Sequence, residues 1–235
     1  MSVNAPSTFL ELVQRLRQEA GASGTGPSTV VSQVGEYARL VSWIVSAWLD
    51  VQRKHDDWGF LRSSCLFVTV AGQSEYTPVQ CGITAGTFGK WDMETLRNYV
   101  TAAGITSEIP MDGGWDYDDW KNTYLFGANR NVRTRPMVAA EKPSDHSLAL
   151  GPVPAAGYTV TSDFYTTAVE LLANGDTPAI EVADRLIIVW RALMDYGGYN
   201  AASEAYQRAK QEHDTIMQRL ESRWLKPIRL GAPLA

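Results

Sequence analysis

The chain lacks the surplus of basic residues that DNA-binding proteins usually carry. Its 235 residues include 21 Lys and Arg against 26 Asp and Glu, which gives a formal net charge of -5. A protein that grips the phosphate backbone presents a basic face, and this composition supplies no overall attraction of that kind. Any contact with nucleic acid is therefore expected to be loose or repulsive.

Long apolar runs are also missing. The most apolar stretch, residues 186–190, ends at Arg191, whereas a membrane-spanning helix needs about 18 apolar residues. The first eight residues show neither the basic start nor the apolar core of a secretory signal. We therefore expect no membrane partner and folding in a cytoplasm.

Residues that commonly carry catalysis are scarce. The two cysteines, Cys65 and Cys81, form no Cys-x-x-Cys pair and are expected to be reduced, structural thiols. The three histidines, His55, His146 and His213, lie in three different segments. The sequence contains no nucleophile elbow, no His-Glu-x-x-His motif and no phosphate-binding Gly-Lys-Ser/Thr loop. We expect no cofactor, no metal site and no nucleophile-based enzyme.

One acidic cluster keeps an enzymatic alternative open. It consists of Asp112, Asp116, Asp118 and Asp119. These carboxylates could bind a hard cation, or those at 116, 118 and 119 could act with His146 in a carboxylate-dependent hydrolase or a lysis-associated enzyme. The spacing differs from that of a calcium loop, and acidic residues are common in the first turn of a helix. A short helix over residues 116–126 is the simpler interpretation.

Helical periodicity marks both ends of the chain. A helix is predicted from about residue 9 to residue 20, with Ser7 or Thr8 as its N-cap and Glu11 closing a capping box. Apolar residues at three- and four-residue steps predict a long helix over residues 30–55. Another helix begins at residue 182 and is apolar nearly all round, which indicates burial. The Tyr-Gly-Gly-Tyr segment at 196–199 is expected to break this helix or to join it tightly to a last helix that ends before residue 227.

Between the helical ends the apolar period changes to two. Strands are predicted over residues 64–70, 134–140, 147–150 and 158–167, separated by prolines and glycines. Leu66, Val68 and Val70 share one face of the first strand. The sequence therefore predicts an α+β fold with an α-helical bundle (residues 1–58 and 180–226), an inserted β-rich domain (60–170) and an extended C-terminal arm (227–235).

One local basic cluster is a candidate contact surface. Arg130, Arg133 and Arg135 lie next to a predicted strand. They could touch DNA phosphate or an acidic partner such as a tail protein. Arginines beside a strand also serve as a solvated edge that discourages unwanted strand pairing. Both interpretations stay open from the sequence.

Four stretches, taken in order, resemble a known protein family. They are residues 34–61, 68–76, 150–160 and 192–200. Together they resemble the adaptor proteins that sit below the portal of tailed bacteriophages, and the last stretch is also similar to tail tubular protein A of short-tailed phages. The resemblance spans roughly residues 9 to 210 and leaves out the Gly-rich joint at 21–26 and the tail after Trp224.

The resemblance implies a ring, usually of twelve subunits, at the head-tail junction of the virion. Such a ring binds the portal protein, offers a platform to tail or nozzle proteins, and lets packaged DNA pass without sequence-specific binding. A ring contact is expected at Trp43 and at an Ala-rich edge that permits close helix approach: Ala201, Ala202, Ala205 and Ala209. The last helix and the apolar arm are expected to bind the portal through Trp224, Lys226, Pro227, Ile228, Arg229, Leu230 and Leu234. The isolated chain, made in the host cytoplasm, is expected to stay monomeric or weakly associated until the portal templates it.

Overall fold

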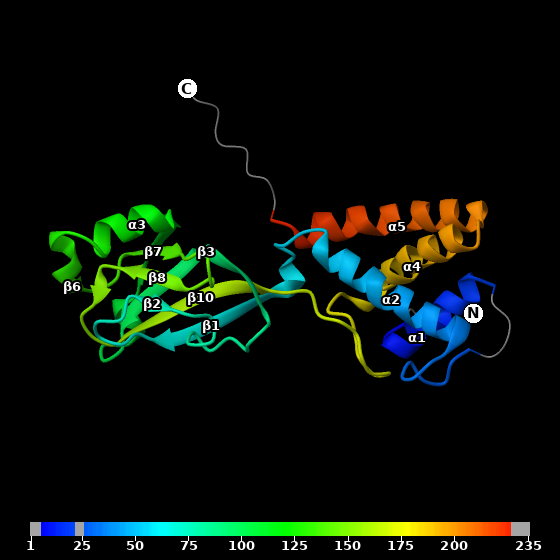
Figure 1. Cartoon of the computed structure of the whole chain (residues 1–235), viewed down its shortest axis with the longest axis horizontal. Coiled ribbons are helices and arrows are strands. Elements are labelled where there is room, and N and C mark those ends of the chain that lie inside the picture. The colour runs from blue at the N-terminus through cyan, green and yellow to red at the C-terminus, as the bar shows by residue number, and fades with distance from the viewer. Residues whose placement is uncertain (1–5, 22–25, 227–235) are drawn as a thin grey trace, which may run out of the picture. The chain divides into compact units, whose positions relative to one another are not determined.

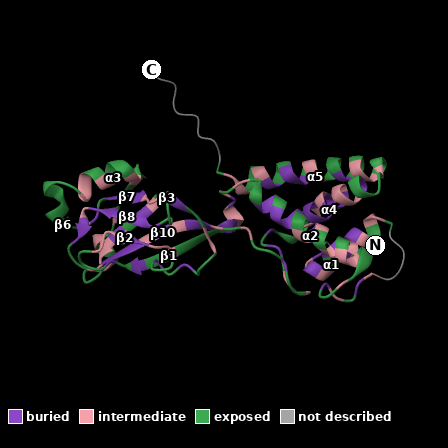
Figure 2. Ribbon diagram, in the orientation of Figure 1, coloured by how far each residue is buried: buried purple, intermediate pink, exposed green. Residues whose placement is uncertain are grey.

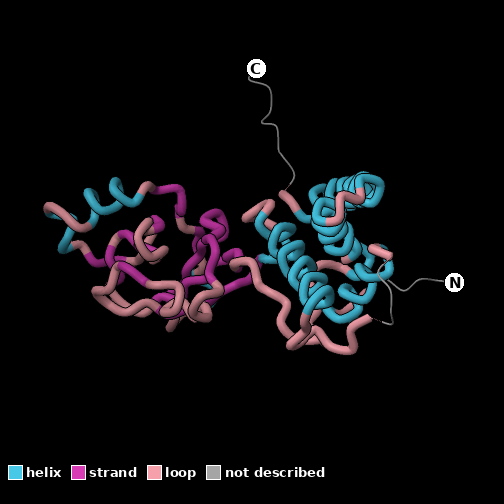
Figure 3. The backbone as a smooth tube through the Cα atoms, turned by 45° about the vertical axis from the view of Figure 1, so that its right-hand side comes forward, coloured by secondary structure: helices cyan, strands magenta, loops and turns pink. Residues whose placement is uncertain are grey.

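The computed structural model describes residues 6–21 and 26–226, and the chain folds as two compact units. The helical unit joins Met1–Phe60 with Ala168–Ala235, and the β-rich unit is the continuous segment Leu61–Thr167. Figure 3 shows the strands of the described chain in the β-rich unit, which also contains a short helix, and helices with loops in the other unit. The combination of helices and sheets confirms the α+β class expected from the sequence.

The helical unit is built around one central helix. Its elements are α1 (Phe9–Glu19), α2 (Gly35–Arg53), the short turn η4 (Val182–Asp184), α4 (Leu186–Tyr199) and α5 (Ser203–Trp224), with η1 (Gly59–Leu61) where the two units meet in the sequence (Figure 1). Helix α4 packs against α1, α2 and α5. Its Ile188, Val189 and Leu193 have no exposed surface. An all-round apolar helix is stable in this position because a neighbour covers each of its faces.

The start of α1 agrees with the prediction, whereas the start of α2 does not. Thr8 caps α1 and forms a capping box with Glu11, so the predicted cap is confirmed. The long helix begins at Gly35 and not at residue 30. The Val30 amide donates to the Asn174 side chain at 2.7 Å, which holds the preceding residues in a loop. Gly35 itself has a φ of 63°, a left-handed conformation that suits glycine at this turn into the helix.

Of the two possibilities for residues 196–199, a break is wrong, because α4 continues through both glycines to Tyr199, and a short turn then joins it to α5. A methyl group on Gly197 would lie 3.1 Å from the backbone nitrogen of Tyr206 in α5. Glycine at this position therefore allows two helices to approach closely. The turn follows at residues 200–202, where Ala201 has a φ of 52°.

The segment between residues 168 and 179 belongs to the helical unit, although the sequence placed the edge of the bundle at 180. The Val169 amide donates to Gln52 Oε1 at 3.0 Å, and the Phe9 amide donates to the Asp176 carbonyl at 2.8 Å. These bonds tie the segment to α1 and α2. The observed boundaries are therefore Phe60/Leu61 and Thr167/Ala168.

The β-rich unit contains two four-stranded sheets, ordered β1-β10-β3-β4 and β2-β8-β7-β5, and a short β6-β9 pair. Its strands are β1 (Arg62–Val68), β2 (Glu75–Tyr76), β3 (Phe88–Val100), β4 (Ile109–Pro110), β5 (Asp112–Trp115), β6 (Arg133–Thr134), β7 (Val138–Glu141), β8 (Leu148–Gly151), β9 (Val153–Pro154) and β10 (Tyr158–Thr166). Its helical pieces are η2 (Ile105–Ser107), α3 (Tyr117–Tyr124) and η3 (Ala128–Asn131). Side chains from both four-stranded sheets, including Phe67, Leu96, Tyr76 and Leu150, form one apolar core. Figure 2 marks the buried stretches of these strands in purple.

Helix α3 covers a second, smaller core. Trp120 has no exposed surface and packs with Val138, Ala140 and Ala149 of β7 and β8. Asp116 caps this helix by accepting the amides of Asp118 and Asp119, as the acidic pattern predicted. The short helix predicted over residues 116–126 is therefore confirmed.

Two features of the first sheet were not predicted. The longest strand, β3, escaped the sequence analysis because a register shift interrupts its pairing with β10: Thr161 pairs with Arg97, but Asp163 pairs with Asp92. In β1, Leu66 and Val68 are 58% and 50% exposed, while Phe67 enters the core. The apolar face of β1 noted in the sequence is thus directed to solvent.

Candidate functional site

An aromatic patch lies where α2 and α4 pack together, and we define it as Arg39, Trp43, Tyr196 and Tyr199. The Trp43 ring contacts the rings of Tyr196 and Tyr199, each with centroids 5.9 Å apart. The Arg39 guanidinium lies 4.9 Å from the centroid of the Tyr199 ring. Tyr199 is nevertheless 62% exposed. The patch is therefore pre-organised within the chain and still offers aromatic surface to a partner.

Helix geometry explains how these four residues meet. Arg39 and Trp43 are four residues apart on α2, and Tyr196 and Tyr199 are three apart on α4, so each pair shares one helix face. The sequence analysis identified Trp43 alone. The i,i+4 spacing of arginine and tryptophan was the available signal for Arg39, whereas the two tyrosines were assigned to a break or a tight joint between helices.

The alanines predicted at the subunit contact separate into two groups. Ala201 is exposed and Ala202 half-buried, and both lie in the turn that directly follows Tyr199. Ala205 is half-buried in the first turns of α5. Ala209 is fully buried within its own unit, so the prediction that it contacts another subunit is wrong. Small side chains here serve the packing of α5 on α4.

The C-terminal end of α5 is half-buried against the residues that precede β1. Trp224 packs edge-on against Phe60 with centroids 5.9 Å apart. Its indole nitrogen is buried and has no hydrogen-bond partner among the residues that the structure describes. Lys226 is exposed. The remaining residues predicted to bind the portal lie outside the described residues: Pro227, Ile228, Arg229, Leu230 and Leu234.

Charged contacts hold this end of α5 in place. Asp184 is fully buried and accepts hydrogen bonds from Arg219 Nε at 2.7 Å and from Arg223 at 3.0 Å. Arg223 also pairs with Glu181 at 2.6 Å. These bonds join α5 to the start of α4. The C-terminal end of α5, which leads to residue 226, is therefore firmly anchored to the rest of the helical unit.

A second charged group fixes α5 to the end of α2. The Glu221 carboxylate accepts from His55 Nε2 at 3.0 Å and from Lys54 Nζ at 2.9 Å. The hydrogen bond from His55, followed by that from Lys54, lowers the pKa of Glu221 below its ordinary value of 4.5. His55 thus has a structural partner in Glu221.

The predicted arginine cluster is divided by the structure. Arg135 donates from Nε to Asn98 Oδ1 at 2.6 Å and from its Nη2 to the carbonyls of Asn98 and Ser107. Its guanidinium therefore serves the fold by joining β3 to η2. Arg130 in η3 and Arg133 in β6 are exposed, and no ion pair or hydrogen bond of their side chains is found among the described residues. These two remain candidates for contact with DNA or tail.

The residues of the enzymatic alternative are not joined in one site. His146 Nδ1 lies 2.6 Å from Glu141 Oε1, and in the described part of the chain no hydrogen bond links it to the aspartates at 116, 118 or 119. Asp116 is occupied by the helix amides of α3. A search of the described residues finds no group of three or more His, Cys, Asp or Glu side chains that could hold a metal ion.

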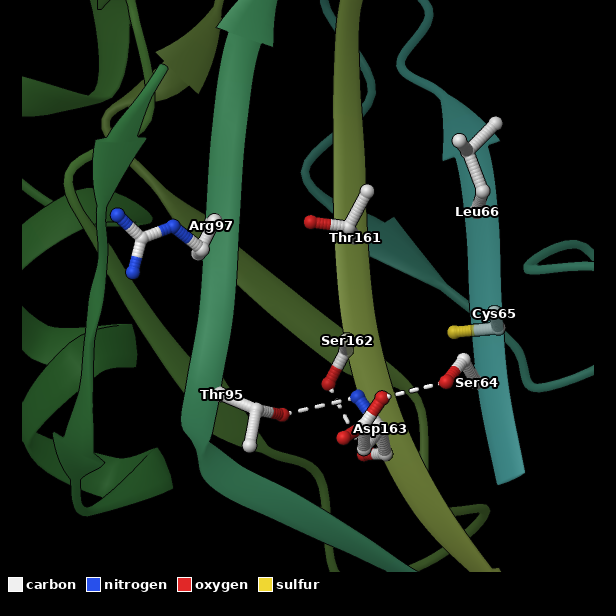
Figure 4. A pocket seen from close by; sticks show the side chains of 8 residues that line it. All are labelled: Ser64, Cys65, Leu66, Thr95, Arg97, Thr161, Ser162 and Asp163. Atoms are coloured by element: carbon white, nitrogen blue, oxygen red, sulfur yellow. Dashed lines mark hydrogen bonds between the residues drawn. The ribbon is translucent and has the colours of Figure 1, made fainter. Parts of the chain in front are cut away.

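The outer face of the first sheet contains a shallow hollow, shown in Figure 4. It is lined by Ser64, Cys65, Leu66, Thr95, Arg97, Thr161, Ser162 and Asp163. Its polar groups bond to one another: the Ser64 hydroxyl donates to Asp163 Oδ1 at 2.7 Å, and the Asp163 amide donates to Thr95 Oγ1 at 2.8 Å. Burial raises the pKa of the Cys65 thiol to about 11. The thiol is protonated at neutral pH and is therefore a poor nucleophile. Cys65 and Cys81 are both free.

Comparison with known proteins identifies the family. No described helix is long and apolar enough to cross a membrane. No curated protein matches the sequence. The family model described as SU10 adaptor protein matches residues 7–231, including the Gly-rich joint and the first residues of the arm, which the sequence resemblance left out. Because this match covers nearly the whole chain, the chain belongs to the SU10 adaptor protein family, whose members are structural adaptors of bacteriophage particles.

Proposed function

We propose that this chain forms the adaptor ring below the portal, which joins the capsid to the tail and continues the DNA channel at the head-tail junction of the virion. The family match over residues 7–231 carries the proposal, because it spans both units of the fold. The number of copies that fits the resemblance is twelve. Portal protein and tail or nozzle proteins are the partners, and no cofactor is required.

The aromatic patch supports a role in the contact between copies. Arginine, tryptophan and tyrosine provide much of the binding energy at protein interfaces. All three residue types occur in the patch, and Tyr199 leaves most of its surface uncovered. The small side chains of Ala201 and Ala202, in the turn after Tyr199, let another helix come close. In a ring, this face would meet a different face of the next copy.

The end of α5 supports a role in portal binding. The chain leaves an anchored helix at residue 226 and continues with the apolar sequence 227–235. The indole nitrogen of Trp224, at the same place, is buried and has no hydrogen-bond partner among the described residues, so its donor is unused in the single chain. An apolar segment next to an unused donor fits a contact that forms on assembly.

The charge of the chain fits a channel for moving DNA. A net charge of -5 per copy gives no general attraction for phosphate. Duplex DNA would pass such a surface without being gripped and without its sequence being read. The net negative charge of each copy therefore favours passage of DNA over tight binding of DNA.

Deleting residues 227–235 tests the portal contact. We expect the shortened chain to lose binding to purified portal and to keep its circular-dichroism melting curve, because the buried apolar residues of the described chain lie between Phe9 and Leu220. Unchanged portal binding by the shortened chain would contradict the arm's role.

Tyr199→Ala is expected to lower the number of copies per portal. Leu172→Ala is the matched control, since Leu172 is also an exposed apolar residue of the helical unit. Light scattering that shows a stable ring without portal would contradict templated assembly.

A further inference from the structure

The β-rich unit carries unpaired charges of opposite sign on the two sides of α3. Asp118 and Asp119 are exposed in the first turn of this helix, and Arg130 and Arg133 are exposed in η3 and β6, which follow it. Across the described parts of the chain, the side chains of these four residues form no ion pair or hydrogen bond. The chain therefore leaves two carboxylates and two guanidinium groups available to an outside partner.

Exposed apolar residues lie in the same segment as the arginines. Phe126 is 54% exposed and Val132 is 41% exposed, directly before and within the stretch that contains Arg130 and Arg133. A strand edge that only needed solvation would be served by the arginines alone. Arginine beside exposed aromatic and aliphatic residues is more typical of a surface that contacts another protein.

The acidic pair, Asp118 and Asp119, and the basic pair, Arg130 and Arg133, are separated along the chain by the rest of α3. An α-helix rises 1.5 Å per residue, so the eight residues of α3 span about 12 Å. The aspartates lie in the first turn of α3, and the arginines lie beyond its C-terminal end, in η3 and β6. A rotational ring is built from heterologous contacts, in which one face of a copy meets a different face of the next. Opposite charges in the first turn of α3 and in the two elements that follow it match that requirement.

We propose that the surface formed by Arg130, Arg133, Phe126 and Val132 binds a neighbouring copy of this chain. In this contact, Asp118 and Asp119 of one copy pair with Arg130 and Arg133 of the next. The contact also covers Phe126 and Val132. The inference rests on the proposed ring and adds a contact made by the β-rich units. DNA is a weaker candidate, because phosphate would gain nothing from the apolar residues and would be repelled by the nearby carboxylates.

Charge exchange provides the test. The variants D118K/D119K and R130E/R133E each place like charges at every contact, and we expect each to reduce portal-bound rings at least about tenfold. A mixture of the two variants can alternate around a ring so that every contact is again between opposite charges. A combined variant with all four substitutions restores the pairing in a single chain. Both are expected to recover ring formation to within about threefold of the wild type.

A matched control separates this contact from a general charge effect. E170K/E212K changes the net charge as much as D118K/D119K does, but on exposed residues of the helical unit, and is expected to form rings normally. Melting curves of all variants show that they are folded. Normal rings from either reversed variant would overturn the inference, as would failure of both the mixture and the combined variant to recover.

Further outcomes show whether the ring itself or only this contact within the ring is wrong. If R130E/R133E formed normal rings but lost binding to DNA or to tail protein, the arginines would belong to that partner and the inference would be wrong. If the wild-type chain formed no ring on the portal, the proposed function would be wrong and this contact with it. Rings that form equally well for every variant reject the contact while leaving the proposed function intact.

Discussion

The interactions that stabilise the helical unit internally differ from those that stabilise the β-rich unit. The β-rich unit is one continuous segment whose sheets close through backbone pairing of β1, β10 and β3. The helical unit is assembled from two segments separated by that whole insertion. Side chains tie its segments together, for example Gln52 to the backbone of Val169, and Arg185 to the Ser7 carbonyl. In addition to the apolar packing around α4, the interrupted unit thus uses side-chain hydrogen bonds between its segments, whereas the continuous unit uses strand pairing and packing.

The largest expected effect comes from leaving the buried Asp184 unpaired. Replacing both of its partners, Arg219→Gln with Arg223→Gln, is expected to lower the free energy of unfolding of the helical unit by about 3–5 kcal/mol, because an uncompensated charge remains buried. Hydrogen exchange of each unit in rising urea measures the change. Adding Asp184→Asn should recover part of the loss. Equal destabilisation of the β-rich unit would contradict independent stabilisation of the two units.

A glycine pair gives the corresponding test in the β-rich unit. A methyl group on Gly113 would lie 2.2 Å from the Met93 carbonyl oxygen, whereas on Gly114 the nearest atom would be at 3.4 Å. Gly113→Ala is therefore expected to cost about 3 kcal/mol, since the backbone must shift, and Gly114→Ala less than about 1 kcal/mol. Hydrogen exchange should show the loss in the β-rich unit only. A similar cost for both variants would argue against the close approach of β5 to β3.

Removing the hydrogen bonds between Gln52 and the Val169 backbone, which join the two segments of the helical unit, should have an intermediate effect on the free energy of unfolding. Gln52 is 2% exposed, and its amide bonds both the N–H and the C=O of Val169 at 3.0 Å. Gln52→Ala is expected to lower the free energy of unfolding by about 2 kcal/mol, because two backbone groups lose their partner. Gln218→Ala, on the exposed side of α5, is the control. Urea denaturation that shows no difference between them would remove the argument for side-chain ties.

The smallest effect concerns pH. Hydrogen bonds from His55 and Lys54 lower the pKa of Glu221 in the folded chain, so its stabilising contribution is present above pH 4.5 and is lost as the pH falls through the lowered value. Glu221→Gln should cost less than about 1 kcal/mol at neutral pH, since the group is partly exposed. The variant should also lose less stability than the wild type on acidification. Parallel stability curves for the two proteins below pH 5 would contradict this assignment.

Local signals in the sequence predicted local structure well. The capping box at Thr8 and Glu11 and the Asp116 cap were readable because the interacting residues are a few positions apart. Strand β3 was not readable, because its pattern is interrupted by a register shift that depends on β10. The uninterrupted helix at Gly197 likewise depends on how close α5 lies.

The candidate surfaces were only partly predictable for a similar reason. Trp43 was identified, but its contacts with Tyr196 and Tyr199 come from another helix. Arg133 and Arg135 were equal candidates before the structure was known, whereas the Arg135 guanidinium donates to backbone carbonyls of β3 and η2. Which arginines remain available depends on tertiary contacts that no local pattern records.

Electron microscopy of the full chain mixed with purified portal tests the central claim most directly. We expect a closed ring of copies that is coaxial with the portal and continues its channel. Single or irregularly attached copies, with no closed ring on any portal, would contradict it.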